Sequence, residues 1–333
     1  METYQKISTI CLFILTMIAT AYVLTVTKTV FIPFVLSVFI ALVIAPVMGK
    51  AQKKLKVPRF VVLIGTILFF ILIFMMITVV TAESIESFAD SSNQYKDKVQ
   101  QVSTFFAKTA NDLGFTVEER SVKELTKKIP FTQLIKTLST AVISLFSNTF
   151  LVIIFCIFLL SGEGLRDVSE DSIITDIKES VGKYVGTKLL VSAATGFLTY
   201  LLLKLLNVEM SFMFATLTFL LNFIPTIGSI IAVALPLPII LLQFGFTSPF
   251  WICLFFLCLI QITIGNIIEP KIMGENIGLH PVTILLSLAF WGFLWGVTGM
   301  FLSVPIMASL KIVFEKFQLT RPIADAFAGD LKI

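Results

Sequence analysis

Five apolar runs of about 20 residues dominate this chain and determine the medium in which it can fold. They lie at 7–27, 30–49, 60–82, 138–161 and 187–206. A helix of that length crosses the hydrocarbon core of a bilayer. Charged residues make up only 14% of the 333 residues, whereas a soluble domain carries about a quarter. The sequence therefore predicts an all-α polytopic membrane protein.

Three further apolar regions complete the membrane part. The run at 249–268 has Trp251 at one end, which suits an interfacial anchor. The regions 210–245 and 281–313 are each too long for one crossing and short for two, and each carries Gly and Pro near its middle. We expect about six full spans plus two broken re-entrant hairpins, whereas simple hydropathy gives eight spans.

The short loop between the second and third runs orients the chain. It contains five basic residues and no acidic residue: Lys50, Lys53, Lys54, Lys56 and Arg59. The positive-inside rule places this loop, and with it the N-terminus, in the cytoplasm. The C-terminal tail is cytoplasmic by parity. We therefore expect a multi-pass protein of the bacterial cytoplasmic membrane, without a cleavable signal peptide.

Five parts are predicted along the chain. They are a three-span bundle at 1–82, an extracytoplasmic helical segment at 83–137, a fourth span with a cytoplasmic amphipathic helix at 138–186, a transport core at 187–313 and a cytoplasmic tail at 314–333. The extracytoplasmic segment reads as two helices that either pack on the membrane domain or meet a neighbouring subunit. The apolar face Ile174, Ile177, Val181 and Val185 suits an interfacial helix.

The second half alternates span, broken hairpin, span, broken hairpin. The two hairpins therefore enter from opposite sides and form an inverted repeat. Their sequences resemble each other faintly, as G-S-I-I-A-V-A-L-P from Gly228 and G-M-F-L-S-V-P from Gly299. Inverted repeats with discontinuous helices are typical of secondary transporters.

The first hairpin breaks around Pro225 and Gly228. A break leaves backbone groups that need protein, water or a ligand as partners. The start of the second half-helix offers N–H groups to an anion or a hydroxyl-rich solute. Asn222 adds an amide one turn earlier. The alternative is a kinked helix whose freed groups are bonded by neighbouring Ser and Thr side chains.

A second polar insertion spans 265–281. Asn266 and Glu269 are about one helical turn apart and should share a face. An ionisable group in a membrane segment is a functional candidate. The alternative is that Glu269 forms an interfacial ion pair with Lys271, or caps the second hairpin. His280 is expected at the start of a helix, before Pro281, rather than in a proton relay.

Three motifs together resemble the autoinducer-2 exporter (AI-2E) family of bacterial membrane proteins over essentially the whole chain. They are F-I-P-T-I-G from Phe223, N-I-I-E-P-K-I-M-G from Asn266, and W-G-F-L-W-G-V-T-G-M-F-L-S-V-P from Trp291. The resemblance implies a homo-oligomer, a pentamer, that exports the furanone signal autoinducer-2; some members are assigned sodium(lithium)/proton antiport. The residues expected along the substrate path are Asn222, Pro225, Thr226, Gly228, Asn266, Glu269, Pro270, Gly274, Trp291, Gly292, Gly299 and Pro305.

Two transport functions and a passive oligomeric channel remain open. Export of a small polar solute is favoured over cation/proton antiport, because the spans hold almost no carboxylate besides Glu269. An enzyme is not expected: the chain has one His, no H-E-x-x-H and no Walker A motif. No cofactor, metal or nucleic-acid partner is expected. The cysteines read as small buried hydrophobes, namely Cys11, Cys156, Cys253 and Cys258.

Overall fold

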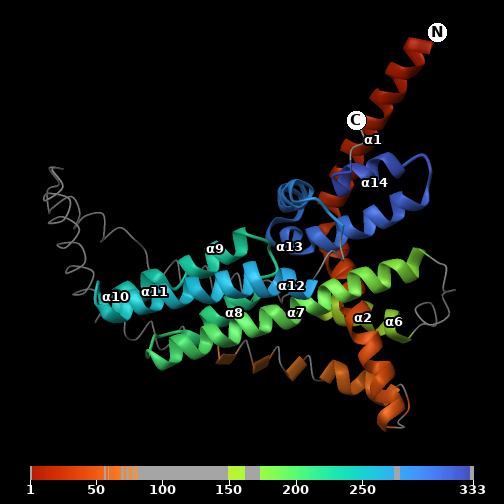
Figure 1. The fold of residues 1–333 in the computed structure, drawn as a ribbon. Coiled ribbons are helices and arrows are strands. Elements are labelled where there is room, and N and C mark those ends of the chain that lie inside the picture. Colours follow the sequence, from red (N-terminus) through yellow and green to blue (C-terminus); the bar gives the residue numbers. More distant parts are fainter. Residues whose placement is uncertain are drawn as a thin grey trace, which may run out of the picture. The chain divides into compact units, whose positions relative to one another are not determined.

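The computed structural model is helical throughout the part of the chain that it describes (Figure 1). The described residues are 2–55, 58, 60–68, 71–72, 75–76, 79–80, 149–161, 173–273 and 278–330. Five stretches in these ranges are long and apolar enough to cross a membrane: Lys28–Pro46, Ile173–Leu205, Ile227–Phe244, Ser248–Ile272 and Pro281–Lys316. The architecture is that of a polytopic helical membrane protein. The extracytoplasmic segment predicted at 83–137 lies outside the described residues.

The chain divides into two compact units. The first unit comprises Met1–Ile67, Ser147–Gly186 and Glu275–Ile333, and the second unit comprises Leu68–Phe146 and Thr187–Gly274. The predicted transport core at 187–313 contributes residues to both units. The five-part division of the sequence stays a prediction.

The first unit contains several helices among the described residues, besides the helical residues 60–67. These are α1 (Glu2–Val26), α2 (Lys28–Leu55), α6 (Thr149–Ser161), α13 (Pro281–Lys316), α14 (Arg321–Ala328) and the start of α7 (Ile173–Leu205). Phe39 of α2, Val181 of α7 and Trp291 of α13 share one core cluster. The apolar face predicted to lie on the membrane surface is part of one continuous helix. Ile177 and Val185 pack with Val181 against this cluster, whereas Ile174 is exposed.

Cysteine burial only partly follows the prediction. Cys156 and Cys253 are buried, but Cys11 is exposed, so the expectation that all four are buried is wrong for Cys11. The reason is that lipid and protein interior select the same apolar side chains. An apolar run alone does not distinguish a lipid-facing position from a protein-facing one.

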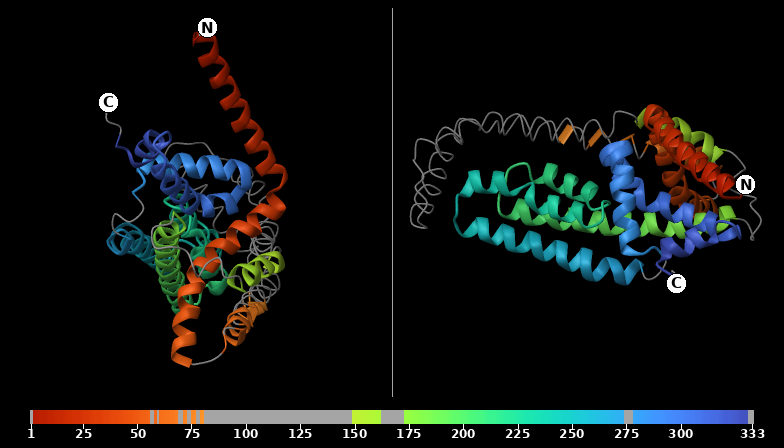
Figure 2. Two further views of the ribbon diagram at one scale, coloured as in Figure 1. Left: turned by 90° about the vertical axis from the view of Figure 1, so that its right-hand side faces the viewer. Right: turned by 90° about the horizontal axis from the view of Figure 1, so that it is seen from above.

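Helix α13 bends sharply in its middle, so that its two arms run in different directions (Figure 2). Gly296 has φ 64° and ψ −144°, a backbone conformation that L side chains rarely adopt. Across this residue the Ser287 hydroxyl donates to the Ser303 carbonyl at 3.0 Å, whereas 16 residues of straight helix span about 24 Å. The element therefore consists of two helical arms that bend sharply at Gly296 and contact one another.

The second unit contains the rest of α7 and a series of shorter elements. These are α8 (Ser211–Leu221), α9 (Ile227–Ala234), α10 (Leu237–Phe244), α11 (Ser248–Gln261), a π-helix (Ile262–Ile268) and α12 (Glu269–Met273). Its apolar core lies toward one end and includes Leu203, Phe214, Ile240 and Cys253. Helices α7, α8 and α11 run side by side (Figure 1).

Helices α7 and α8 pack as an antiparallel pair. Their contacts join Ser192 to Asn222, Gly196 to Phe219, and Tyr200 to Phe212, so the numbers rise on one helix as they fall on the other. Gly196 permits the close approach, because a Cβ at this position would lie 3.0 Å from the Ala215 carbonyl oxygen. The C-terminal end of α8 is thereby fixed beside the middle of α7.

The chain reverses again after α8. Residues 222–226 interrupt the helix, and α9 with α10 returns along α8. At the far end the Gln243 amide donates to the Asn207 carbonyl at 2.6 Å and accepts from the Glu209 N–H at 3.0 Å. These bonds tie the end of α10 to the loop between α7 and α8. The tip of this helix pair, Asn222–Thr226, therefore lies at the opposite end from the apolar core.

Candidate functional site

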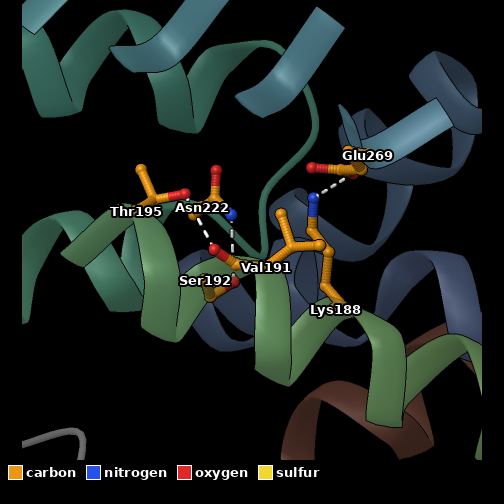
Figure 3. A network of polar contacts seen from close by, with 6 residues as sticks. All are labelled: Lys188, Val191, Ser192, Thr195, Asn222 and Glu269. Atoms are coloured by element: carbon orange, nitrogen blue, oxygen red, sulfur yellow. Dashed lines mark hydrogen bonds and ion pairs between the residues drawn. The ribbon is translucent and has the colours of Figure 1, made fainter. Parts of the chain in front are cut away.

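An ion pair between Lys188 and Glu269 lies at the polar end of the second unit (Figure 3). Lys188 lies near the middle of α7 and Glu269 begins α12. Their side chains are only 3% and 16% exposed. A lysine is almost never this deeply buried without a partner of opposite charge. The pair brings a positive and a negative group into the interior at no net charge.

The alternative partner proposed from sequence, Lys271, is wrong. The carboxylate of Glu269 pairs with Lys188 instead. Lys271 lies two residues after Glu269 in the same helix, and residues at that spacing do not face each other. The ion pair therefore connects α7 with α12, two helices that are far apart in the sequence.

One turn along α7, an amide and a hydroxyl meet. The Asn222 side-chain N–H donates to the Ser192 hydroxyl at 3.0 Å, and both residues are buried (Figure 3). The Thr195 hydroxyl donates to the Val191 carbonyl at 2.8 Å within the same helix. Buried polar groups are costly unless they are hydrogen-bonded. These bonds explain how the polar groups are tolerated here.

Four buried polar side chains form a stripe along α7. They are Lys188, Ser192, Thr195 and Thr199. Their spacing of four, three and four residues puts them on one face of an α-helix. We call this set the α7 polar stripe. Beyond it, at Leu203, the same face enters the apolar core.

The backbone at the tip Asn222–Thr226 is largely hydrogen-bonded within itself. The N–H groups of Asn222, Ile224 and Gly228 donate to the carbonyls of Thr218, Leu221 and Ile224. The Ile227 N–H donates to the Pro225 carbonyl at 2.6 Å. The tight turn therefore pairs several of the N–H groups that the break was predicted to free.

Thr226 and Gly228 shape the tip. Thr226 has φ 61°, which is uncommon for a residue with a side chain. A Cβ at Gly228 would overlap the Leu221 carbonyl oxygen and lie 3.3 Å from the Ile224 Cβ. Gly228 is thus required because the backbone at this position lies close to the end of α8. Pro225 lies in the turn between α8 and α9.

The second motif is divided by the π-helix. Asn266 lies in the π-helix and is exposed, whereas Glu269 starts α12 and faces Lys188. The expectation that the two share a face assumed α-helical spacing, which a π-helix does not have. Pro270 is exposed in α12. Gly274 lies outside the described residues.

The third motif forms the bend of α13 in the first unit. Trp291 and Trp295 pack with their ring centroids 4.8 Å apart. A Cβ at Gly299 would overlap the Trp291 carbonyl oxygen, and one at Gly292 would lie 2.8 Å from the Met300 methyl carbon. Pro305 is buried further along the second arm. The glycines of this motif allow the two arms to touch.

His280 caps the first turn of α13. Its Nδ1 accepts a hydrogen bond from the Val282 N–H at 3.3 Å, and Pro281 occupies the first helical position. The prediction of a helix-start residue is confirmed.

Sequence reasoning missed Lys188 and the hydroxyls of the α7 polar stripe. The four-three-four spacing of Lys, Ser, Thr and Thr in an otherwise apolar helix was an available signal. Among the residues that the structure describes, no cluster of His, Cys, Asp and Glu could hold a metal ion.

Comparison with known proteins gives matches over most of the chain. The model of a family described as AI-2E family transporter matches residues 12–318. A Haemophilus influenzae protein named "Putative transport protein" is 32% identical over 318 residues, which cover 90% of each chain. The Escherichia coli protein named AI-2 transport protein TqsA is 29% identical over 297 residues, covering 86% of this chain and 85% of its own.

Proposed function

This chain belongs to the AI-2E family of transporters, and we propose that it exports a small polar solute, such as autoinducer-2, across the bacterial cytoplasmic membrane. The name of the Escherichia coli relative supports autoinducer-2 as the first solute to test.

The observation that carries the proposal is the α7 polar stripe together with Asn222 and Glu269. Buried polar residues in membrane helices mark solute and ion pathways. Here the charges cancel within the Lys188–Glu269 pair, and the remaining groups are hydroxyls and an amide. Such a lining suits a neutral solute that forms hydrogen bonds, more than it suits an ion.

Sodium(lithium)/proton antiport is the second candidate. Glu269 favours it, because this carboxylate is mostly buried beside the π-helix. Against it, the carboxylate that would bind the cation already has Lys188 as its partner. A passive oligomeric channel is the third candidate.

We extend the proposal to membrane topology and assembly. The helix breaks at Asn222–Thr226 and at Gly296 support two re-entrant hairpins, which we propose enter from opposite sides as an inverted repeat. Both termini are then cytoplasmic. The family resemblance supports a homo-oligomer, for which we propose a pentamer.

Single-cysteine labelling tests this topology. We expect Thr247→Cys, in a cysteine-free background, to react with an impermeant thiol reagent from outside. Glu275→Cys should react only after the cytoplasmic side is opened. Eight single spans reverse both results, so labelling of Thr247→Cys from the cytoplasm alone would refute the hairpins.

Efflux from proteoliposomes tests the function. Purified protein is reconstituted, and release of autoinducer-2 is compared with the pH change driven by sodium or lithium gradients. We expect saturable autoinducer-2 release and no cation-driven pH change. Proton movement driven by sodium or lithium, without solute release, would establish the antiporter instead.

A further inference from the structure

Gln261 carries a buried acceptor that has no partner among the described residues. The residue is 7% exposed, and its Oε1 forms no hydrogen bond in this part of the chain. It is the last residue of the inward face of α11, after Phe250, Cys253 and Leu257. The π-helix follows directly. A buried acceptor left unpaired costs free energy, so its retention needs an explanation.

The packing of the second unit places Gln261 near the α7 polar stripe. Leu203 of α7 and Cys253 of α11 share the apolar core at one end, and Lys188 pairs with Glu269 at the other. The segment from α11 to α12 therefore runs antiparallel to α7. By this register Gln261 is level with Thr195. The register of α8 against α7 puts the buried Thr218 at the same level.

Two oxygen acceptors at this level have no donor among the described residues. The Thr195 hydroxyl already donates to the Val191 carbonyl, so its lone pairs remain to accept. The Gln261 Oε1 can only accept. Toward Leu203 the interior becomes apolar, while toward Ser192 and Asn222 it stays polar (Figure 3). Thr195 therefore lies where the polar end of the second unit meets its apolar core.

We propose that Gln261 and Thr195 form the binding site for the hydroxyl groups of the exported solute, an inference that rests on the proposed export function. The solute donates to the Gln261 Oε1 and to the Thr195 oxygen, and so gives each of these two acceptors a hydrogen-bond partner. The ligand class is a small neutral molecule with at least two hydroxyl groups.

The variant Gln261→Met tests the site. It keeps the length of the side chain and removes the acceptor. We expect the autoinducer-2 concentration for half-maximal efflux to rise about tenfold, the effect of one lost hydrogen bond. Without solute, the Tm in detergent should stay the same or rise, because an unpaired acceptor has been replaced by an apolar group. Leu257→Met, one turn earlier on the same face, is the matched control and should leave both quantities unchanged.

Thermal shifts separate this site from the proposed function. Autoinducer-2 should raise the Tm of the wild type and of Leu257→Met, but not that of Gln261→Met. Unchanged half-saturation in Gln261→Met would overturn the site while export stands. A wild type that exports no autoinducer-2 but shows this pattern of shifts would contradict export and still support the site. A wild type without any shift, or one stabilised through Gln261 by sodium or lithium only, would overturn the hydroxyl site.

Discussion

Replacing Glu269 with glutamine is expected to lower the free energy of unfolding by about 3–5 kcal/mol, the usual effect of removing one partner of a buried ion pair. The variant leaves the Lys188 ammonium group in a site where its side chain is only 3% exposed. Glutamine retains the volume and a hydrogen-bond acceptor. The loss therefore reports the missing charge.

A double-mutant cycle checks this result. The unfolding midpoint in detergent is measured for Glu269→Gln, Lys188→Met and the double variant. The double variant should recover most of the stability, because it contains no unpaired buried charge. Lys271→Met, in the same short helix but exposed, is the control and should behave as wild type. Additive losses in the double variant would show that the two charges do not interact.

The same variant separates the two transport functions. In an antiporter, Glu269 binds the proton and the cation in turn, so Glu269→Gln removes the pH-dependent sodium or lithium flux. In an exporter of a neutral solute, the variant changes the rate or the stability and no cation coupling is lost. Cation-driven pH change in proteoliposomes is measured beside solute efflux. Sodium-coupled proton movement that survives Glu269→Gln would exclude Glu269 as the coupling site.

Replacing Gly228 with leucine is expected to abolish transport while the protein still inserts and assembles. Any Cβ at this position overlaps the Leu221 carbonyl oxygen, which belongs to backbone and cannot rotate away. The tip Asn222–Thr226 must then move, and Asn222 moves with it. Efflux should fall by at least about a hundredfold, since a displacement near 1 Å has effects of that order at an enzyme site.

The matched control for this variant is Gly186→Leu. Gly186 also lies in a helix, but a Cβ there would meet nothing within 4 Å. Initial efflux rates are compared after equal amounts of assembled protein have been reconstituted. Near wild-type efflux from Gly228→Leu, or an equal loss from Gly186→Leu, would show that close approach at the tip does not matter for transport.

The sequence predicted the helix breaks better than the groups that line them. Pro225 and Gly228 indicated a break, and the structure interrupts the helix at 222–226. In the third motif, Gly292, Gly296 and Gly299 were equivalent by residue type. Only the backbone shows that Gly296 turns the chain, while the other two allow close contact.

The ion pair could not be predicted from local spacing. Lys188 and Glu269 are 81 residues apart, and their meeting depends on the antiparallel register of α7 against α11 and α12. The sequence also predicted a continuous α-helix where the structure has α11 followed by a π-helix. The π-helix changes the face of the helix on which each later residue lies. The Gln261 acceptor is recognisable only once its burial and lack of a partner are known.

Transient counterflow of autoinducer-2 tests export by a carrier most directly. Proteoliposomes are loaded with excess unlabelled autoinducer-2 and diluted into a trace of the labelled compound, with empty liposomes as the baseline. A carrier exchanges one bound molecule for another, so we predict that labelled autoinducer-2 inside rises above its equilibrium level before it falls, and that Gly228→Leu shows no such rise. Labelled autoinducer-2 that only climbs to equilibrium in the wild type would contradict the account and indicate a passive pore.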